Sequence, residues 1–185
     1  ESRINGLKAC TNKYVIFLDQ DDLLINNAFL SYYNILKVNK DIDMILSNGY
    51  LEYANGKDVI FGSHWDQSLA CKRSAYLKIR DFIASPGQCC ININSIPKPW
   101  IQNIMKSNGT DDYFLWLLMF EENPDIVINP DVVYHHTYTG ENLSDNSLKM
   151  KASEKEMMAL LADKSIYSPK SYKTLRRARN YKDKY

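Results

Sequence analysis

The stretch that most constrains the fold is residues 13–22, KYVIFLDQDD. Its five consecutive apolar residues, YVIFL, predict a strand that is buried on both faces, as in a parallel sheet. The run stops at three acids, Asp19, Asp21 and Asp22. Carboxylates crowded at one strand end repel one another unless a cation or strong hydrogen-bond donors lie among them. The stretch therefore predicts a buried strand with an acidic turn at its carboxyl end, where open α/β sheets bind ligands.

The acidic cluster has two interpretations. Oxygen ligands favour Mg²⁺ or Mn²⁺ over zinc, and neither Cys nor His lies beside these acids in the sequence. A divalent metal site is therefore one interpretation. The other is an acidic turn that caps a helix starting near Leu23, because acids are common at helix starts. Both stay open on the sequence alone.

Length and composition describe an ordinary globular chain. Its 185 residues suffice for one domain with a real core, and the 45% hydrophobic fraction excludes wholesale disorder. A net charge of +1 gives no general attraction to nucleic acid, so we expect no nucleic-acid partner. The four Cys match no zinc pattern and suggest buried free thiols in a reducing compartment. With no apolar run of roughly 20 residues and no signal peptide, we expect a cytoplasmic protein.

Patterning along the first half of the chain predicts alternating helices and strands. A short helix over residues 1–11 leads directly into the first strand, which has no earlier strand beside it. Either later strands flank it, or the chain is the back part of a longer fold. Further predicted elements are a helix over 23–38, a strand over 41–54, a hairpin turn at Asn55-Gly56, a basic helix over 71–82 and a strand over 88–93.

A second acidic pair, Asp111 and Asp112, begins the stretch DDYFLWLLMF. The apolar residues behind the pair predict a helix buried nearly all round. A carboxylate at the start of such a helix can be held rigidly in a pocket, and ordinary capping of the helix explains the same residues.

A strand predicted over residues 125–134 ends at His135 and His136. Adjacent residues on an extended segment point to opposite sides, so at most one of these two side chains reaches a shared site. A metal-binding role and ordinary packing both stay open for that histidine.

The chain becomes basic near its C-terminus. A helix is predicted from about residue 146 to 162, and residues 170–185 hold seven Lys or Arg against one acid, with Tyr between them. Such a segment is suited to touch an anionic membrane surface, and a solvated helix or tail is the alternative. We therefore expect a partial catalytic domain over residues 1–145 and a basic helical extension over 146–185. Contact with an anionic membrane, the first of these two interpretations, would place the protein at the inner face of a membrane.

Three segments in this order resemble the family-2-type glycosyltransferases of GT-A fold: SRINGLKACTNKYVIFLDQDDLL, GTDDYFLWLLM and YHHTYTGENLS. Together they span most of residues 2–144. The sequence departs from the family pattern at Asn12-Lys13, where Gly is usual, and at Leu118, where Arg is frequent.

The resemblance implies an α/β fold, a GT-A-like mixed sheet flanked by helices. The family usually opens with two strands that hold the base and ribose of the sugar nucleotide, and no such strands precede Glu1. By resemblance, this chain is an N-terminally truncated GT-A domain that retains the metal, acceptor and catalytic-base half.

The function implied is transfer of a sugar, with inversion, from a nucleotide-sugar donor to a saccharide or lipid-linked acceptor in cell-surface polysaccharide synthesis. A Mn²⁺ or Mg²⁺ ion would assist at the donor phosphates. The resemblance assigns metal binding to Asp21 with Asp19 and His136, His135 being the second choice; donor binding to Asp19 and Arg3; and the general base to Asp112, with Asp111 as runner-up. By their position in the chain, Trp65, Gln88 and Trp100 would bind the acceptor, although core packing explains Trp100 better.

Two other function classes stay open. One is a non-catalytic remnant or interaction domain, which the missing N-terminal strands favour. The other is a phosphatase with Asp19 as nucleophile, which lacks the small Gly-containing turn that such sites use after the Asp. Exposed strand edges would also favour self-association into a homo-oligomer.

Overall fold

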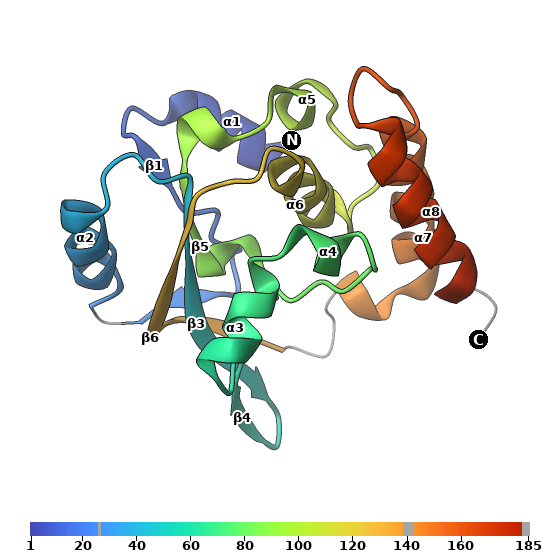
Figure 1. The fold of residues 1–185 in the computed structure, drawn as a ribbon. Coiled ribbons are helices and arrows are strands. Elements are labelled where there is room, and N and C mark those ends of the chain that lie inside the picture. Colours follow the sequence, from blue (N-terminus) through green and yellow to red (C-terminus); the bar gives the residue numbers. More distant parts are fainter. Residues whose placement is uncertain (26, 139–142, 183–185) are drawn as a thin grey trace. The chain divides into compact units, whose positions relative to one another are not determined.

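The fold is known from a computed structural model that describes residues 1–25, 27–138 and 143–182 (Figure 1). The chain forms two compact units, each assembled from three segments. Unit 1 comprises Glu1–Cys71, Phe82–Ser95 and Pro124–Glu141, and unit 2 comprises Lys72–Asp81, Ile96–Asn123 and Asn142–Tyr185. The predicted division into residues 1–145 and 146–185 stays a prediction.

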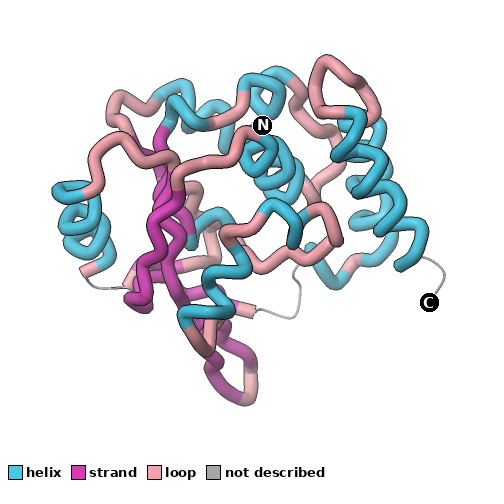
Figure 2. The backbone as a smooth tube through the Cα atoms, viewed as in Figure 1, coloured by secondary structure: helices cyan, strands magenta, loops and turns pink. Residues whose placement is uncertain are grey.

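Unit 1 is built on a mixed sheet, whose strands are magenta in Figure 2. Its described order is β1-β5-β3-β6-β2, with β4 paired to β3. The long strands β3 and β6 are parallel, and the other pairs are antiparallel. The strand bounds are β1 Tyr14–Val15, β2 Leu23–Leu24, β3 Met44–Tyr53, β4 Gly56–Val59, β5 Cys89–Asn92 and β6 Ile126–Thr137.

The helices of unit 1 are α1 Ser2–Ala9, α2 Ala28–Val38 and α3 His64–Ala70, with short 3₁₀ turns η1 Pro86–Gln88 and η2 Ile93–Ser95. Helix α2 packs on the sheet through Ala28 and Tyr32, which join Ile45 and Val133 in one buried cluster. The predicted mixed α/β architecture, a sheet flanked by helices, is therefore confirmed at this level (Figure 1).

The first strand differs from its prediction. Only Tyr14 and Val15 join the sheet, at its edge and antiparallel to β5, and both are half-buried. Leu18, the last apolar residue of the run, is exposed. The expectation of a strand buried on both faces in a parallel sheet is wrong because, within the described residues, β5 is the one strand beside β1. Strand β5, which comes later in the chain, lies beside β1, in agreement with the first of the two alternatives given above.

Pro130 lies inside β6 and coincides with irregular pairing. The register of β6 against β3 shifts on both sides of Asn48, between partners Asn129 and Tyr134. Proline has no N–H for the ladder, so a bulge at this point is the expected response. The shift changes which face of the sheet the residues after it present, compared with the residues before it.

Unit 2 is helical in its described residues. Its helices are α4 Arg73–Tyr76, α5 Lys98–Gln102, α6 Asp111–Glu121, α7 Ser147–Leu161 and α8 Pro169–Lys182, with a 3₁₀ turn η3 Leu143–Asp145. Helix α6 is buried along eight consecutive residues, Tyr113 to Phe120, as its apolar sequence predicted. The basic helix predicted over 71–82 is shorter in the structure, where only Arg73–Tyr76 form helix α4. In the described part of the chain, no helix is long and apolar enough to cross a membrane.

Candidate functional site

The acidic turn after β1 sends its three carboxylates to three different environments. The turn is closed by a backbone hydrogen bond from Asp22 N to Asp19 O of 3.1 Å. Asp19 is half-buried, Asp21 is exposed and Asp22 is almost completely buried. The repulsion expected of three adjacent acids is therefore relieved by separation and by local partners.

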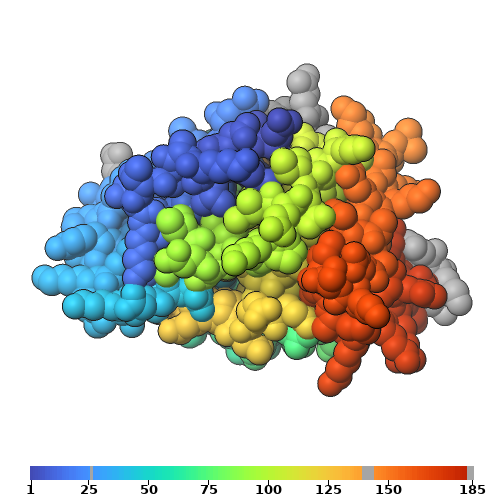
Figure 3. Space-filling view, turned by 90° about the horizontal axis from the view of Figure 1, so that it is seen from above, coloured from blue at the N-terminus to red at the C-terminus, as the bar shows by residue number. Residues whose placement is uncertain are grey.

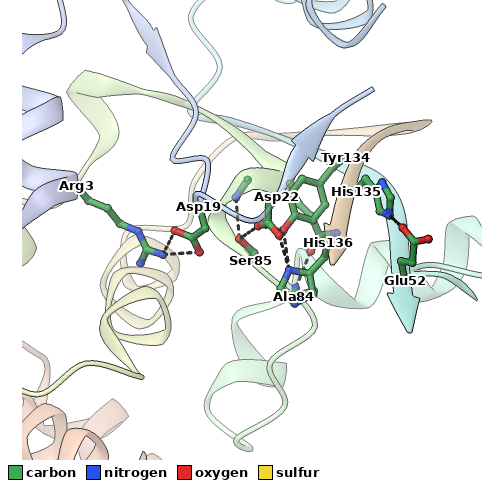
Figure 4. A network of polar contacts seen from close by, with 11 residues as sticks. Arg3, Asp19, Asp22, Glu52, Ala84, Ser85, Tyr134, His135 and His136 are labelled. Carbon is green, nitrogen blue, oxygen red and sulfur yellow. Dashed lines mark hydrogen bonds and ion pairs between the residues drawn. The ribbon is translucent and has the colours of Figure 1, made fainter. Parts of the chain in front are cut away.

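Asp22 is the centre of a buried polar cluster, shown in Figure 4. His136 Nδ1 lies 2.7 Å from one carboxylate oxygen, and the Tyr134 hydroxyl donates to the other. The Ser85 hydroxyl also donates to that second oxygen, at 3.2 Å. Three segments far apart in the sequence thus meet on one carboxylate. We call these four residues the Asp22 cluster.

The alternation of β6 explains which histidine joins the Asp22 cluster. Tyr134 and His136 lie two residues apart and so share a face, whereas His135 points to the other side. His135 Nε2 instead lies 2.5 Å from a carboxylate oxygen of Glu52 on β3, without the geometry of a hydrogen bond. The prediction that only one of the two histidines reaches a shared site is confirmed (Figure 4).

Two glycines make room for the ring of Tyr134, which is fully buried. A Cβ added to Gly87 would lie 2.5 Å from the ring, and one added to Gly49 would lie 2.8 Å from the Tyr134 carbonyl oxygen and 2.9 Å from the ring. Larger residues at either position would displace the ring, and with it the hydroxyl that donates to Asp22. The tyrosine is thus held in a slot that the sequence specifies with glycine.

The electrostatics of the cluster favour a charged pair. Burial raises the pKa of Asp22, but hydrogen bonds from His136 and Tyr134 outweigh burial, so its pKa lies below the ordinary value. The hydrogen bond to Asp22 raises the pKa of His136 against the opposing effect of burial. Burial, reinforced by the hydrogen bond to Asp22, raises the pKa of Tyr134, so this residue stays a neutral donor.

Asp19 is paired with Arg3 of α1. One guanidinium nitrogen lies 2.7 and 2.9 Å from the two oxygens of the Asp19 carboxylate. The side chains of Arg3 and Asp19 keep 22% and 39% of their surface exposed, so a ligand can still reach them. The structure therefore brings together the two residues that the resemblance assigned to donor binding.

The donor set partly fits a divalent cation. Asp21 is exposed, and its carboxylate makes no hydrogen bond with the described residues. When the ring of His136 is neutral, its Nδ1 contact with Asp22 leaves Nε2 open to a ligand, an arrangement often seen behind metal-bound histidines. Within the described ranges, however, no three His, Cys, Asp or Glu side chains converge as a metal-binding group. Carboxylate oxygens suit Mg²⁺ or Mn²⁺. The side chains of Asp19, Asp21 and His136 would have to move closer together when such an ion binds.

The predicted acceptor residues lie in contrasting environments. Trp65 at the start of α3 is 66% exposed, as a stacking surface requires. Gln88 is fully buried, and its amide accepts from Ala84 N at 2.6 Å and donates to Ser47 O at 3.3 Å. The side chain of Gln88 is thus engaged inside unit 1.

The remaining predicted residues belong to unit 2. Asp111 and Asp112 begin α6, and Asp112 Oδ1 accepts from Tyr113 N at 2.7 Å. Both acids are half-buried. Trp100 is buried, and its indole N–H donates to the Asp111 carbonyl at 2.9 Å, so the expected core role of Trp100 is confirmed.

Sequence reasoning missed two members of the Asp22 cluster. The sequence predicted Tyr134 only as the last residue of a strand, and it did not connect Ser85 with the acidic turn. The signal for Tyr134 was its spacing of two from His136 on one strand. Ser85 had no such signal, because its contact with Asp22 spans 63 residues.

Comparison with models of known protein families found no match, and comparison with curated proteins found no significant match.

Proposed function

We propose that the chain contains the metal- and acceptor-binding residues of a glycosyltransferase that uses a nucleotide-sugar donor. The observation that supports this proposal is the meeting of the acidic turn with His136, 114 residues further along the chain, at 2.7 Å. The glycosyltransferase resemblance implies that this histidine can join the acidic turn at a metal site, whereas a helix-capping turn needs no histidine.

In this proposal the Asp22 cluster positions the site. Asp22 is too buried and too fully engaged to bind a ligand, so it anchors the turn and orients the ring of His136. Asp21, with Asp19 and His136 Nε2, would hold a Mn²⁺ or Mg²⁺ ion. When bound, such an ion would neutralise charge on the diphosphate of the donor. Arg3, already beside Asp19, would add a positive charge for the same phosphates.

The other roles rest on the resemblance. Asp112, with Asp111 as runner-up, is the proposed base that accepts the proton of the acceptor hydroxyl, a function that contributes roughly 10²- to 10⁴-fold. Trp65 is the best-placed acceptor residue because its indole is exposed. The acceptor would be a saccharide or a lipid-linked saccharide, and transfer would invert the anomeric carbon, in the synthesis of a cell-surface polysaccharide.

Calorimetric titration of UDP into the purified chain, with and without Mn²⁺, tests the donor site. We expect binding that requires Mn²⁺ and is lost in Asp21→Asn, a change at an exposed side chain that leaves the fold intact. Asp58→Asn is the matched control, because Asp58 is an exposed acid of unit 1 on β4. Full metal-dependent binding by Asp21→Asn would refute the assignment of Asp21.

A non-catalytic interaction domain is the second candidate. In its favour, two of the three acids already have partners: Asp19 pairs with Arg3, and Asp22 with His136. A turn with a purely structural role would need the same pairs. This candidate would be supported if calorimetry in the presence of Mn²⁺ detected no binding of UDP, GDP or dTDP. The chain must also unfold cooperatively, which shows that it is folded. The phosphatase alternative is weakened by the sequence, because the Gly-containing turn that such sites use does not follow Asp19.

A further inference from the structure

Charge is divided unequally between the two units. Unit 1 contains six Lys or Arg against twelve Asp or Glu, a formal charge of −6. Unit 2 contains seventeen against ten, a formal charge of +7. The net charge of +1 for the whole chain therefore conceals a strongly basic unit.

Helix α8 concentrates this positive charge. It contains six Lys or Arg and no acid over fourteen residues. Ser171 and Leu175 form its buried side. Lys170, Lys173 and Arg177, spaced three and four residues apart, share one exposed stripe, and Arg176 is exposed beside it. At 1.5 Å per residue, the exposed cations of α8, from Lys170 to Lys182, extend over about 18 Å.

In the described part of unit 2, the acids of α7 do not neutralise this row. Glu154 of α7 pairs with Arg179, the half-buried cation of α8. Glu156 accepts hydrogen bonds from the backbone N–H groups of Lys106 and Ser107, at 2.7 and 2.8 Å. The acids of α7 are thus used inside unit 2, while its three lysines are exposed: Lys149, Lys151 and Lys155.

Helices α7 and α8 present this charge together. They run in opposite directions side by side (Figure 1), and their orange and red atoms adjoin on the surface in Figure 3. The pair therefore places the start of α7 at the same end as the last turns of α8. That end also exposes two apolar side chains, Leu148 at 79% and Tyr181 at 69%.

We propose that the exposed cations of α7 and α8 dock unit 2 on an anionic lipid bilayer. A bilayer surface accepts a long cationic row and also takes up exposed Leu and Tyr side chains at its interface. A nucleic acid would gain from the cations but not from Leu148, so a membrane is the partner that both features fit. This inference is independent of the transfer activity proposed above.

The test is co-sedimentation of the chain with vesicles in which about one-third of the phosphatidylcholine is replaced by phosphatidylserine. Each Lys or Arg near such a surface contributes about fivefold to binding. The triple variant Lys173→Gln, Arg176→Gln, Arg177→Gln should therefore bind roughly a hundredfold more weakly. We expect no binding to phosphatidylcholine alone and release at about 0.5 M salt.

A matched control removes the same charge from unit 1. Lys8, Lys37 and Lys40 are exposed there, and changing all three to Gln should leave vesicle binding within about twofold. An equal loss in this control, or equal binding to neutral vesicles, would overturn the proposal. The charge-conserving variant Arg176→Lys, Arg177→Lys should bind like the original chain, and a large loss in it would also overturn diffuse attraction to lipid.

Two further measurements keep the test decisive. Far-UV circular dichroism and a thermal melt establish that the triple variant folds; if it melts earlier, the double variant Lys173→Gln, Arg177→Gln should show a loss of about twenty-fivefold. Binding of a short DNA duplex through the same residues, with half-saturation at a lower phosphate concentration than the vesicles require, would overturn the membrane in favour of nucleic acid.

Discussion

Substitution of His136 by glutamine should weaken the protein in a pH-dependent way. The folded-state pKa of His136 lies above 6.5, so its stabilising effect is complete below pH 6.5 and fades as the pH rises through the folded value. The folded-state pKa of Asp22 lies below 3.8, so its effect is complete above pH 3.8 and fades as the pH falls through the folded value. The pair therefore stabilises unit 1 most between pH 3.8 and 6.5.

The magnitude follows from what His136→Gln leaves behind. Removing one member of a fully buried ion pair costs about 3–5 kcal/mol, because the other charge stays uncompensated. Here Tyr134 and Ser85 still donate to Asp22, and 21% of the His136 side chain is exposed to water. We therefore expect a loss of about 2 kcal/mol near pH 5.5. Near pH 9 the imidazole is a neutral donor that Gln can replace, and the loss should fall below about 1 kcal/mol.

Urea unfolding followed by circular dichroism, repeated at several pH values, measures this difference. His64→Gln is the control, because His64 is exposed and should show a difference near zero throughout. An NMR titration of the three histidines would show directly which one has the raised pKa. A His136→Gln difference that stays constant or grows from acid to alkaline pH would refute the charged-pair reasoning.

Two further predictions test the packing of unit 1. Gly87→Ala should lower the free energy of unfolding by about 1–3 kcal/mol, because the new Cβ would lie 2.5 Å from the Tyr134 ring. Gly6→Ala is the control: its Cβ would meet nothing within 4 Å, so the change should be neutral or stabilising. Equal urea midpoints for the two variants would contradict the close packing of Gly87 against Tyr134. Under native conditions one thiol, that of exposed Cys10, should react rapidly with a thiol reagent. The other thiols should react slowly, because burial raises the pKa of Cys71 to about 11 and that of Cys90 to about 12. Rapid reaction of two or more thiols would contradict this burial.

Local patterns in the sequence predicted those elements that local chemistry determines. Helix α6 spans Asp111–Glu121, as its apolar run indicated, and the Asn55-Gly56 turn joins β3 to β4. The prediction that only one of His135 and His136 reaches a shared site followed from the alternation of side chains along a strand. In these cases, propensity and periodicity act over a few residues, so a single sequence contains the needed information.

The errors concern features that depend on distant residues. The apolar run before Asp19 indicated a strand with neighbours on both sides, but apolarity does not report how many strands lie beside it. The Arg3–Asp19 pair and the contact of Ser85 with Asp22 join residues whose types are common in loops. The role of Asp22 as the buried anchor depends on its contacts with Tyr134 and His136, which lie more than 100 residues further along the chain.

The three-segment construction of unit 1 has a consequence for its synthesis. Strand β3 is paired in parallel with β6, and Met44 faces Ile126, so much of the sheet cannot close until the ribosome has added about 80 further residues. At typical rates of 5–20 residues per second, this wait lasts roughly 4 to 16 s. Through that interval the edge of β3 that pairs with β6 stays open in the nascent chain. Folding during translation is therefore slow for unit 1, and a chaperone that shields β3 would raise the yield of native protein.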